Sequence, residues 1–160
     1  MFSVVEANLS LPNHGEALLV LLSEYAMDPM GGGAPLAEHV RNKLLSALQA
    51  RTGTHVVLAF ENEHPVGLII SFEGFSTFAC QPVLNLHDVV VSLPYRGKGV
   101  LRLMLNKLEE IARQLDCCKL TMEVLEGNHH AMAAYAAHGF AAYELDPAMG
   151  KAVFWQKKLG

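Results

Sequence analysis

The chain of 160 residues carries 12 Lys and Arg against 16 Asp and Glu, a formal charge of −4 at pH 7, and 51% of its residues are hydrophobic. This length suits one domain, residues 1–160, with a sizeable core, and the acidic balance argues against general nucleic-acid binding. No run reaches the ~18 apolar residues of a membrane span, and the first residues lack the pattern of a secretory signal. Three cysteines, two of them adjacent, make a poor disulfide framework, so we expect reduced thiols in a cytoplasmic protein.

The first third of the chain predicts one strand and two helices. Residues 2–6 favour a strand, and residues 14–26 place leucines and a tyrosine on one side of a helix. The stretch 28–35 is rich in glycine and proline and predicts a loop, which we expect to act as a substrate lid. Residues 36–50 predict a second amphipathic helix.

The middle of the chain predicts a hairpin, a buried strand and a long helix. Residues 54–60 and 66–72 are rich in strand-forming residues and are separated by a turn signal at 62–65. The continuous valine run within 84–91 suits a strand that is buried on both faces. Apolar residues at helical spacing then predict a helix over about 101–115.

The last part predicts two more strand regions around a helix. Residues 119–124 favour a strand, and Asn128 is a suitable N-cap for a helix over 129–138. Residues 140–144 and 153–157 favour a final pair of strands. The predicted order is that of a mixed α/β sheet covered by helices, with a strand–turn–helix at its centre.

A basic, glycine-rich turn joins the valine-rich strand to the long helix, in the stretch VVVSLPYRGKGVLR. Unpaired N–H groups and the macrodipole at a helix start favour a phosphate or pyrophosphate, and Arg96 and Lys98 add full charges. The turn is not a P-loop, because Gly99 stands where Ser or Thr must follow the lysine. It is not a dinucleotide fingerprint either, because Arg102 occupies the third glycine position. A plain charged turn capped by glycine stays open as an alternative.

Arg96-x-x-Gly99 resembles the Arg/Gln-x-x-Gly-x-Gly/Ala turn of the GNAT acyltransferases, with Leu101 at its last position. Downstream, Asn128, Tyr135 and the Gly-Phe pair at 139–140 resemble the second half of that family. The resemblance covers about residues 54–158. It implies a GNAT-like mixed, mostly antiparallel sheet with splayed central strands, flanked by about four helices.

The resemblance also implies acetyl-CoA as acyl donor and no metal. The pyrophosphate would be bound by the turn, and the pantetheine arm would lie along the preceding strand. The cofactor-binding residues implied in this way are Val89, Val90, Val91, Arg96, Gly97, Lys98, Gly99, Val100, Leu101, Arg102, Asn128 and Tyr135. The adjacent pair His129-His130 does not suggest a metal site, because neighbouring residues of a helix point apart.

Two residues are implied as catalytic. Tyr135 would donate a proton to the departing CoA thiolate. The segment from Phe75 to Phe78, followed by Leu86-x-Asp88, resembles the diamine and thialysine acetyltransferase branch, in which a glutamate stands at the position of His87. An imidazole can also act as general base near neutral pH. From the residues alone two alternatives stay open. Tyr135 could be a packing residue of its helix, and His87 could be an interior histidine without a catalytic role.

The resemblance predicts an N-acetyltransferase that acts on a primary amine, either a small diamine or a lysine-like amine. Candidate acceptor residues are Tyr25, Asp28, Glu38, Phe75, Phe78 and Asp88. Carboxylates would pair with the distal cation of the acceptor, and aromatic faces would hold its methylene chain. The alternatives are a protein N-terminal, lysine or aminoglycoside-type acetyltransferase, and a non-catalytic acyl-CoA-binding module. The resemblance also admits a homodimer.

Overall fold

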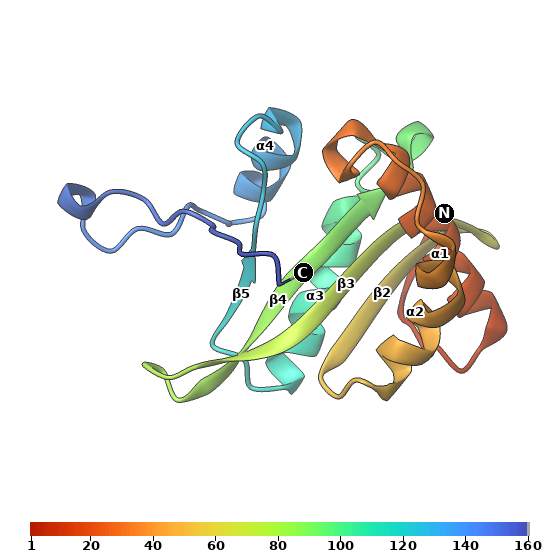
Figure 1. Cartoon of the computed structure of the whole chain (residues 1–160), viewed down its shortest axis with the longest axis horizontal. Helices are drawn as coiled ribbons and strands as arrows, with labels where there is room; N and C mark the ends of the chain where they lie inside the picture. Colours follow the sequence, from red (N-terminus) through yellow and green to blue (C-terminus); the bar gives the residue numbers. More distant parts are fainter. Residues whose placement is uncertain (160) are drawn as a thin grey trace. The chain divides into compact units, whose positions relative to one another are not determined.

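A five-stranded sheet in the order β1-β2-β3-β4-β5 organises the first part of this computed structural model (Figure 1). The structure describes residues 1–159 and divides into two units, Met1–Met122 and Glu123–Gly160, of which the first contains the whole sheet. The first four strands pair antiparallel, and the last strand runs parallel to its neighbour. The strands are β1 (Phe2–Glu6), β2 (Thr54–Glu61), β3 (His64–Ser76), β4 (Gln81–Val91) and β5 (Lys119–Met122).

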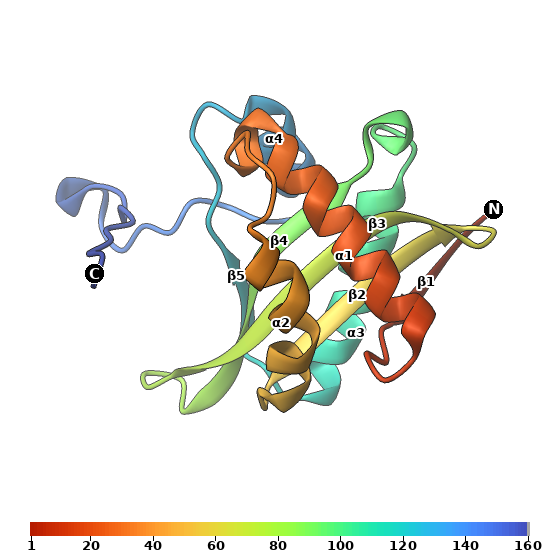
Figure 2. The same cartoon turned by 45° about the vertical axis from the view of Figure 1, so that its right-hand side comes forward.

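Helices cover both faces of the sheet in this unit. Helices α1 (Pro12–Met27) and α2 (Glu38–Ala50) lie on one face, and α3 (Val100–Gln114) lies on the other (Figure 2). The predicted loop between the first two helices contains one short 3₁₀ turn, η1 (Pro29–Gly31). None of the helices within residues 1–159 is long and apolar enough to cross a membrane.

The core forms where the apolar stripes of the helices meet the sheet. Leu18 and Leu21 of α1 are fully buried with Leu58 and Leu68 of the sheet beneath them. Each such leucine contributes about 1.5–3 kcal/mol through burial of apolar surface. On the other face, α3 buries Met104, Leu105, Leu108 and Ile111, as its helical spacing predicts.

The strand buried on both faces is β3 and not β4. Residues 66–71 are buried without interruption, whereas β4 alternates between buried and partly exposed side chains after Leu84. The valine-rich sequence therefore predicted the strand correctly but not its burial. The reason is positional, because β3 lies at the centre of the sheet while β4 loses its outer neighbour part-way along.

An ionic cluster joins three strands on the α3 side of the sheet. The two ring nitrogens of His55 lie 3.0 Å from the Glu6 carboxylate and 2.7 Å from the Glu73 carboxylate. Burial, the largest single effect, lowers the pKa of His55, but the hydrogen bonds to the two carboxylates outweigh it and raise the pKa. Since carboxylates only accept hydrogen bonds, both nitrogens must donate, and the cluster requires the imidazolium form.

The second unit contains α4 (His129–Ala137) and the short turn η3 (Pro147–Met149). The Asn128 side chain caps α4 by accepting a hydrogen bond from the Ala131 N–H at 3.2 Å, which confirms the predicted cap. The predicted strands 140–144 and 153–157 are wrong for the described residues, where a single bridge joins Glu144 to Lys151. Strand-forming side chains alone do not make a strand, because the backbone also needs a paired neighbour.

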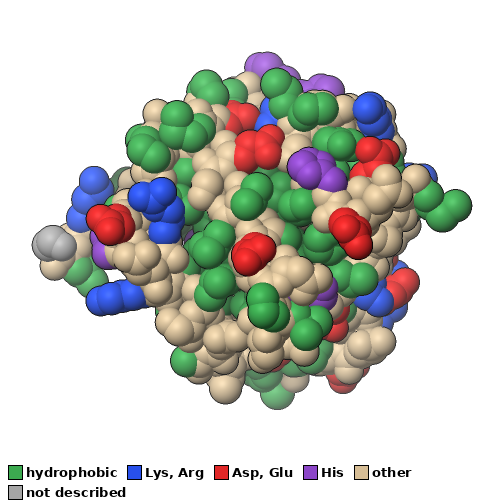
Figure 3. Space-filling model, turned by 90° about the vertical axis from the view of Figure 1, so that its right-hand side faces the viewer, with side chains coloured by type: hydrophobic (Ala, Val, Ile, Leu, Met, Phe, Trp, Pro, Cys, Tyr) green, Lys and Arg blue, Asp and Glu red, His purple; other side chains and the backbone are tan. Residues whose placement is uncertain are grey.

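Charged side chains are dispersed on the face of the molecule that Figure 3 shows. Acidic side chains stand singly there among hydrophobic and polar ones, without merging into one acidic field. A dispersed charge gives weak long-range steering of a substrate.

Candidate active site

The glycine turn leaves a row of backbone N–H groups without partners inside the helix. Gly97 and Gly99 have φ values of 75° and 84°, the left-handed region that favours glycine, and α3 begins directly after them at Val100. Within the turn the Lys98 N–H donates to the Tyr95 carbonyl at 3.4 Å, and after Gly99 the first N–H recorded to bond back is that of Leu103, which donates to the Gly99 carbonyl at 3.2 Å. A Cβ built on either glycine would meet nothing within 4 Å. The turn is thus an open cradle of donors that fits a pyrophosphate.

The two cations of the turn are held in defined positions. The Arg96 Nε donates to the Val91 carbonyl at 3.0 Å, and its Nη2 lies 2.9 Å from an oxygen of Asp28. The hydrogen bond from Arg96 is the main cause that holds the pKa of Asp28 below its usual value. Lys98 places its ammonium 5.2 Å from the ring centre of Tyr95. A residue predicted for the acceptor is therefore tied to a residue predicted for the cofactor.

The start of the turn is fixed to helix α1 by a partly buried contact. The Ser92 hydroxyl donates to the Glu24 carboxylate at 2.6 Å, and the Leu93 N–H donates to the same carboxylate at 3.3 Å. Sequence analysis did not identify this glutamate, and the 68-residue separation leaves no local signal that could have revealed it. The carboxylate stabilises the strand-to-turn junction.

Strand β4 contains a β-bulge at His87. Ile70 of β3 pairs with Asp88, but the next residue, Ser71, pairs with Leu86. His87 is therefore an extra residue without a partner across the ladder. A bulge of this kind bends the strand and changes the direction of the side chains beside it.

The bulge turns two successive side chains toward the α1 and α2 side of the sheet. The His87 ring lies 5.4 Å from the ring of Phe72, which packs against the core on that side. Asp88 is the cross-strand partner of Ile70, which belongs to the same core. In a regular strand two neighbours would point to opposite faces. The bulge therefore brings the predicted base and a predicted acceptor carboxylate together.

The environment of Asp88 is electrostatically unusual. Burial raises the pKa of Asp88, and the charge of the neighbouring His87 opposes that shift. The pKa of Tyr25 on helix α1 is raised by burial first and then by the charges of Asp88 and Asp28. Tyr25 and Asp88 are half-buried and His87 beside them is exposed, so an amine cation that reaches the imidazole from solution would find a carboxylate next to it.

The sheet splits beside this group. Strands β4 and β5 pair in parallel only from Val83 to Leu86, although β4 continues to Val91. Within the first unit, the β5-facing edge of residues 87–91 therefore has no strand partner. The mixed, mostly antiparallel sheet that the resemblance implied is confirmed, and the free edge of β4 starts at the bulged residue.

The structure does not bring all predicted acceptor residues together. Phe75 pairs with Pro82 near the end of the β3–β4 hairpin, six positions along β4 from Asp88. At about 3.3 Å per residue, the two positions are separated by roughly 20 Å along the strand. One small amine is too short to contact both. Phe78 is fully exposed beyond the strand end, and Glu38 is an exposed first residue of α2. A compact acceptor site includes Tyr25 and Asp88 but not the two phenylalanines.

The remaining predicted residues belong to the second unit. Asn128 uses its side chain as the cap of α4, and Tyr135 lies on that helix with its ring centre 6.0 Å from the ring of Phe140. The Tyr135 carbonyl also accepts from the Phe140 N–H at 3.1 Å, in the turn that ends the helix. The tyrosine is thus placed on a short, alanine-rich helix with a defined end.

Arg51 and Phe72 were not singled out from the sequence. The Arg51 guanidinium carbon lies 5.1 Å from the ring centre of Phe72, whose other ring neighbour is His87. Their association depends on the C-terminus of α2 meeting the middle of β3, which no local pattern indicates.

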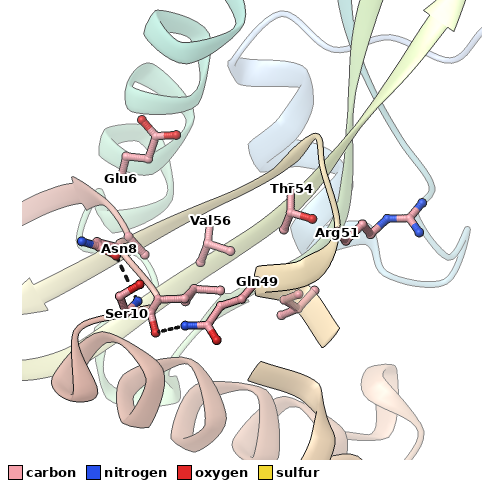
Figure 4. Close-up of a pocket in the computed structure, with 10 residues that line it drawn as sticks. Glu6, Asn8, Ser10, Gln49, Arg51, Thr54 and Val56 are labelled. Carbon is pink, nitrogen blue, oxygen red and sulfur yellow. Dashed lines mark hydrogen bonds between the residues drawn. The ribbon is translucent and has the colours of Figure 1, made fainter. Parts of the chain in front are cut away.

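A pocket of about 490 Å³, which Arg51 helps to line, lies between the end of β1 and the α2–β2 corner (Figure 4). It is lined mainly by polar groups, among them Asn8, Ser10 and Thr54. The Gln49 amide crosses it to donate to the Leu9 carbonyl at 2.7 Å. None of the sequence-predicted site residues lines this pocket.

Comparison with known proteins identifies the fold and the chemistry of this arrangement. Residues 20–140 match the acetyltransferase (GNAT) family. The chain belongs to the GNAT acetyltransferase family. The resemblance that rested on the turn and the downstream motif is therefore confirmed, as are the mixed α/β fold and the prediction of an acyltransferase.

Several individual acetyltransferases are similar to this GNAT acetyltransferase in sequence or in structure. A thialysine N-epsilon-acetyltransferase of Caenorhabditis elegans is 27% identical over 130 residues, which cover 78% of this chain and 75% of the relative. A streptothricin acetyltransferase of Streptomyces lavendulae is 32% identical over 83 residues, covering 52% of this chain and 44% of the relative. The solved structure of a probable acetyltransferase superposes with a TM-score of 0.81 at 21% identity, covering 98% of each chain. The last likeness concerns the fold alone.

Proposed function

We propose that this GNAT acetyltransferase transfers the acetyl group of acetyl-CoA to the primary amine of a small molecule, a diamine or a lysine-like amine. The observation that carries the proposal is the position of the bulge. It sets His87 and Asp88 just beyond the point where β5 ends, on the strand that leads to the donor cradle. The names of the worm and Streptomyces relatives, which refer to amine acceptors, support a small amine.

In the proposed reaction the amine nitrogen attacks the thioester carbonyl carbon directly. His87 removes a proton from the amine, the carbon–sulfur bond breaks, and Tyr135 gives its phenolic proton to the CoA thiolate. The products are an N-acetyl amine and free CoA. Holding both reactants in adjoining sites would supply much of the rate, and a backbone N–H at the bulge could stabilise the developing oxyanion.

Each predicted cofactor residue has a proposed task in this scheme. Arg96, Lys98 and the N–H groups that follow Gly99 would bind the pyrophosphate of acetyl-CoA. The unpaired edge of Val89–Val91 would bind the pantetheine arm, with Asn128 near it. We place the activity in the cytoplasm, since Cys80, Cys117 and Cys118 are free thiols. The homodimer remains a proposal that sedimentation velocity would test.

The direct test is acetylation of an amine panel by the purified protein, with the product detected by mass spectrometry. Detection of released CoA with a thiol reagent would suffer from background, because Cys80 and Cys118 are exposed. We expect acetylated primary amines and no acetylated alcohols. If none of the amines gains an acetyl group, the proposed function is wrong.

Acetyl-CoA binding can be measured separately by thermal shift. At a concentration of 100 times its Kd, acetyl-CoA stabilises by about 2.7 kcal/mol, roughly 5–10 °C in Tm for a chain of this size. We expect Arg96→Gln to weaken binding roughly 10–100-fold, since it removes charge-assisted contacts. Arg113→Gln, which removes an exposed cation from α3, is the matched control and should bind as the unmodified protein does. Equal shifts in all three proteins would contradict the cradle.

A further inference from the structure

One ion pair connects the loop between α1 and α2 to the turn that forms the proposed donor cradle. The Arg96 Nη2 lies 2.9 Å from an oxygen of Asp28, a residue 68 positions earlier in the chain. The two side chains are 41% and 23% exposed, so water reaches the pair and the pair can open at a modest cost. No other ion pair recorded within residues 1–159 joins this loop to the turn.

The loop is folded around Asp28. One carboxylate oxygen of Asp28 accepts from the Met30 N–H at 2.9 Å. The Asp28 carbonyl accepts from the N–H groups of Gly31 and Gly33, at 2.8 and 3.1 Å. A Cβ built on Gly31 would overlap the Tyr25 carbonyl oxygen, so the loop packs directly on the end of α1. The position of Asp28 therefore determines the position of the loop.

The two recorded contacts of the Arg96 guanidinium differ in kind. The Nε donates to the Val91 carbonyl at 3.0 Å, which fixes the side chain to the backbone of the strand. The Nη2 donates to a carboxylate on a side chain that can rotate away. Carboxylate and phosphate oxygens bind to the same fork of a guanidinium, and a phosphate carries the larger charge. The cation at the start of the cradle is thus already bound to an anion that a phosphate can replace.

We propose that Asp28 binds Arg96 in the donor-free protein in the place of a donor phosphate, and that the pyrophosphate of acetyl-CoA displaces it. This inference rests on the proposed function and adds a regulation of the same site. The ion pair lowers the affinity for the donor, because it must open before Arg96 can bind the pyrophosphate. Its opening also releases the loop from the turn and leaves the Asp28 carboxylate without its cation.

The exchange has a consequence for the acceptor side. Burial raises the pKa of Tyr25 most, and the charges of Asp88 and Asp28 raise it further, so both carboxylates act on the same hydroxyl. In the donor-free protein Arg96 offsets the charge of Asp28. After the exchange, two uncompensated carboxylates attract an ammonium near Tyr25. Donor binding therefore strengthens amine binding, and by reciprocity the amine strengthens donor binding.

Isothermal titration calorimetry with acetyl-CoA alone tests the exchange, because this measurement needs no amine. Asp28→Asn removes the charge and keeps an oxygen that can accept from the Met30 N–H, so the loop retains its turn. We expect this variant to bind acetyl-CoA roughly 2–5-fold more tightly, the range for opening a partly exposed ion pair. Asp28→Glu keeps the charge and should return Kd toward that of the unmodified protein. Glu16→Gln, which removes an exposed carboxylate from α1, is the matched control and should leave Kd unchanged.

The same substitution in an Arg96→Gln background separates exchange from simple repulsion. Without the guanidinium, Asp28 has no cation to bind, so Asp28→Asn should give no further change in Kd. A gain of equal size in both backgrounds would show that the carboxylate only repels the phosphates, and it would overturn the exchange. Weaker binding by Asp28→Asn would also overturn it, because Asp28 would then orient Arg96 for the donor. A circular-dichroism melt of each variant establishes that it is folded.

Hydrogen exchange measures the release of the loop. With acetyl-CoA bound, we expect faster amide exchange in a peptide that spans residues 28–35 and slower exchange in the turn at 96–101. In Arg96→Gln the loop should exchange fast without the donor. Unchanged or slower exchange of the loop in the unmodified protein would overturn its release and leave amine acetylation standing. If acetyl-CoA does not bind at all, both this inference and the proposed function are wrong.

Discussion

Arg96 links two regions that would otherwise act separately. The same side chain contacts the Val91 carbonyl at the head of the turn and the Asp28 carboxylate in the loop between α1 and α2. The carboxylate is therefore already paired with a cation and is less available to a diamine than its position in the sequence indicates. Asp88 is the carboxylate that remains beside His87.

The proposed role of Tyr135 as proton donor can be tested by removing a single atom from its side chain. Tyr135→Phe removes only the phenolic oxygen and keeps the ring that faces Phe140. We expect acetyl-CoA to bind with unchanged affinity and kcat to fall about 10²–10⁴-fold, because the thiolate would leave without a proton donor. Steady-state kinetics with thermal shift measures both quantities. Turnover within a few-fold of the unmodified protein would assign Tyr135 to packing.

His87 is tested by the pH dependence of the reaction. A general base works only when it is deprotonated, so kcat/KM should rise with pH until the base has lost its proton. We expect this limb to be lost in His87→Ala and partly restored in His87→Glu. His39→Ala, at an exposed site on α2, is the control. A limb that persists in the alanine variant would assign the base to another group.

At the level of single residues, local motifs could be predicted and distant pairs could not. The turn around Arg96 and the Asn128 cap are visible in the sequence because their partners lie within a few positions. The stacking of Arg51 on Phe72 and the pairing of Arg96 with Asp28 depend on tertiary contacts. For the same reason Phe75 resembled an acceptor residue in the sequence, although the hairpin carries it away from Asp88.

Among the elements, the hydrophobic periodicity predicted the helices of the first unit and all five of its strands, with shifts of a few residues at their ends. It could not reveal the bulge. Placing an extra residue requires the register of β4 against β3, and register depends on pairing across the sheet rather than on composition. The bulge is the feature most important for the proposed chemistry, and the sequence of one strand alone does not reveal it.

The cluster of His55 with Glu6 and Glu73 makes the junction of β1, β2 and β3 sensitive to pH. The folded-state pKa of His55 is raised, so its stabilisation is complete below about pH 6.5, the ordinary pKa, and is lost as pH rises through the folded value. We expect His55→Gln to reduce the free energy of unfolding by about 1 kcal/mol near pH 6, which lowers Tm by roughly 2–4 °C. Near pH 9 the decrease in Tm should be smaller. Thermal melts across this range measure the difference.

The control for that measurement is His130→Gln, an exposed position on α4. Its Tm difference should be small and independent of pH. A His55→Gln difference that is constant from pH 6 to pH 9 would show that the cluster contributes through packing and not through charge.

For the molecule as a whole, the sequence predicted the order of elements better than their assembly. The two final strands were expected from valine, phenylalanine and tryptophan, yet Val153, Phe154 and Trp155 are largely exposed in the second unit. Strand formation at the end of a chain depends on a partner edge that is distant in sequence. The composition of a segment indicates how readily it forms a strand. It does not indicate which other strand it will pair with.

The gene for this chain could lose one codon in β4 without disturbing the rest of the strand. Of the β4 residues from Gln81 to Val91, only His87 lacks a partner in β3, so its deletion would join Leu86 to Asp88 and complete a regular ladder. Every later side chain would keep its present face, and the core would pack as before. A single in-frame deletion would therefore remove the proposed base and leave the strand and the glycine turn after it in place. The proposed chemistry thus depends on one codon that the fold of the strand does not require.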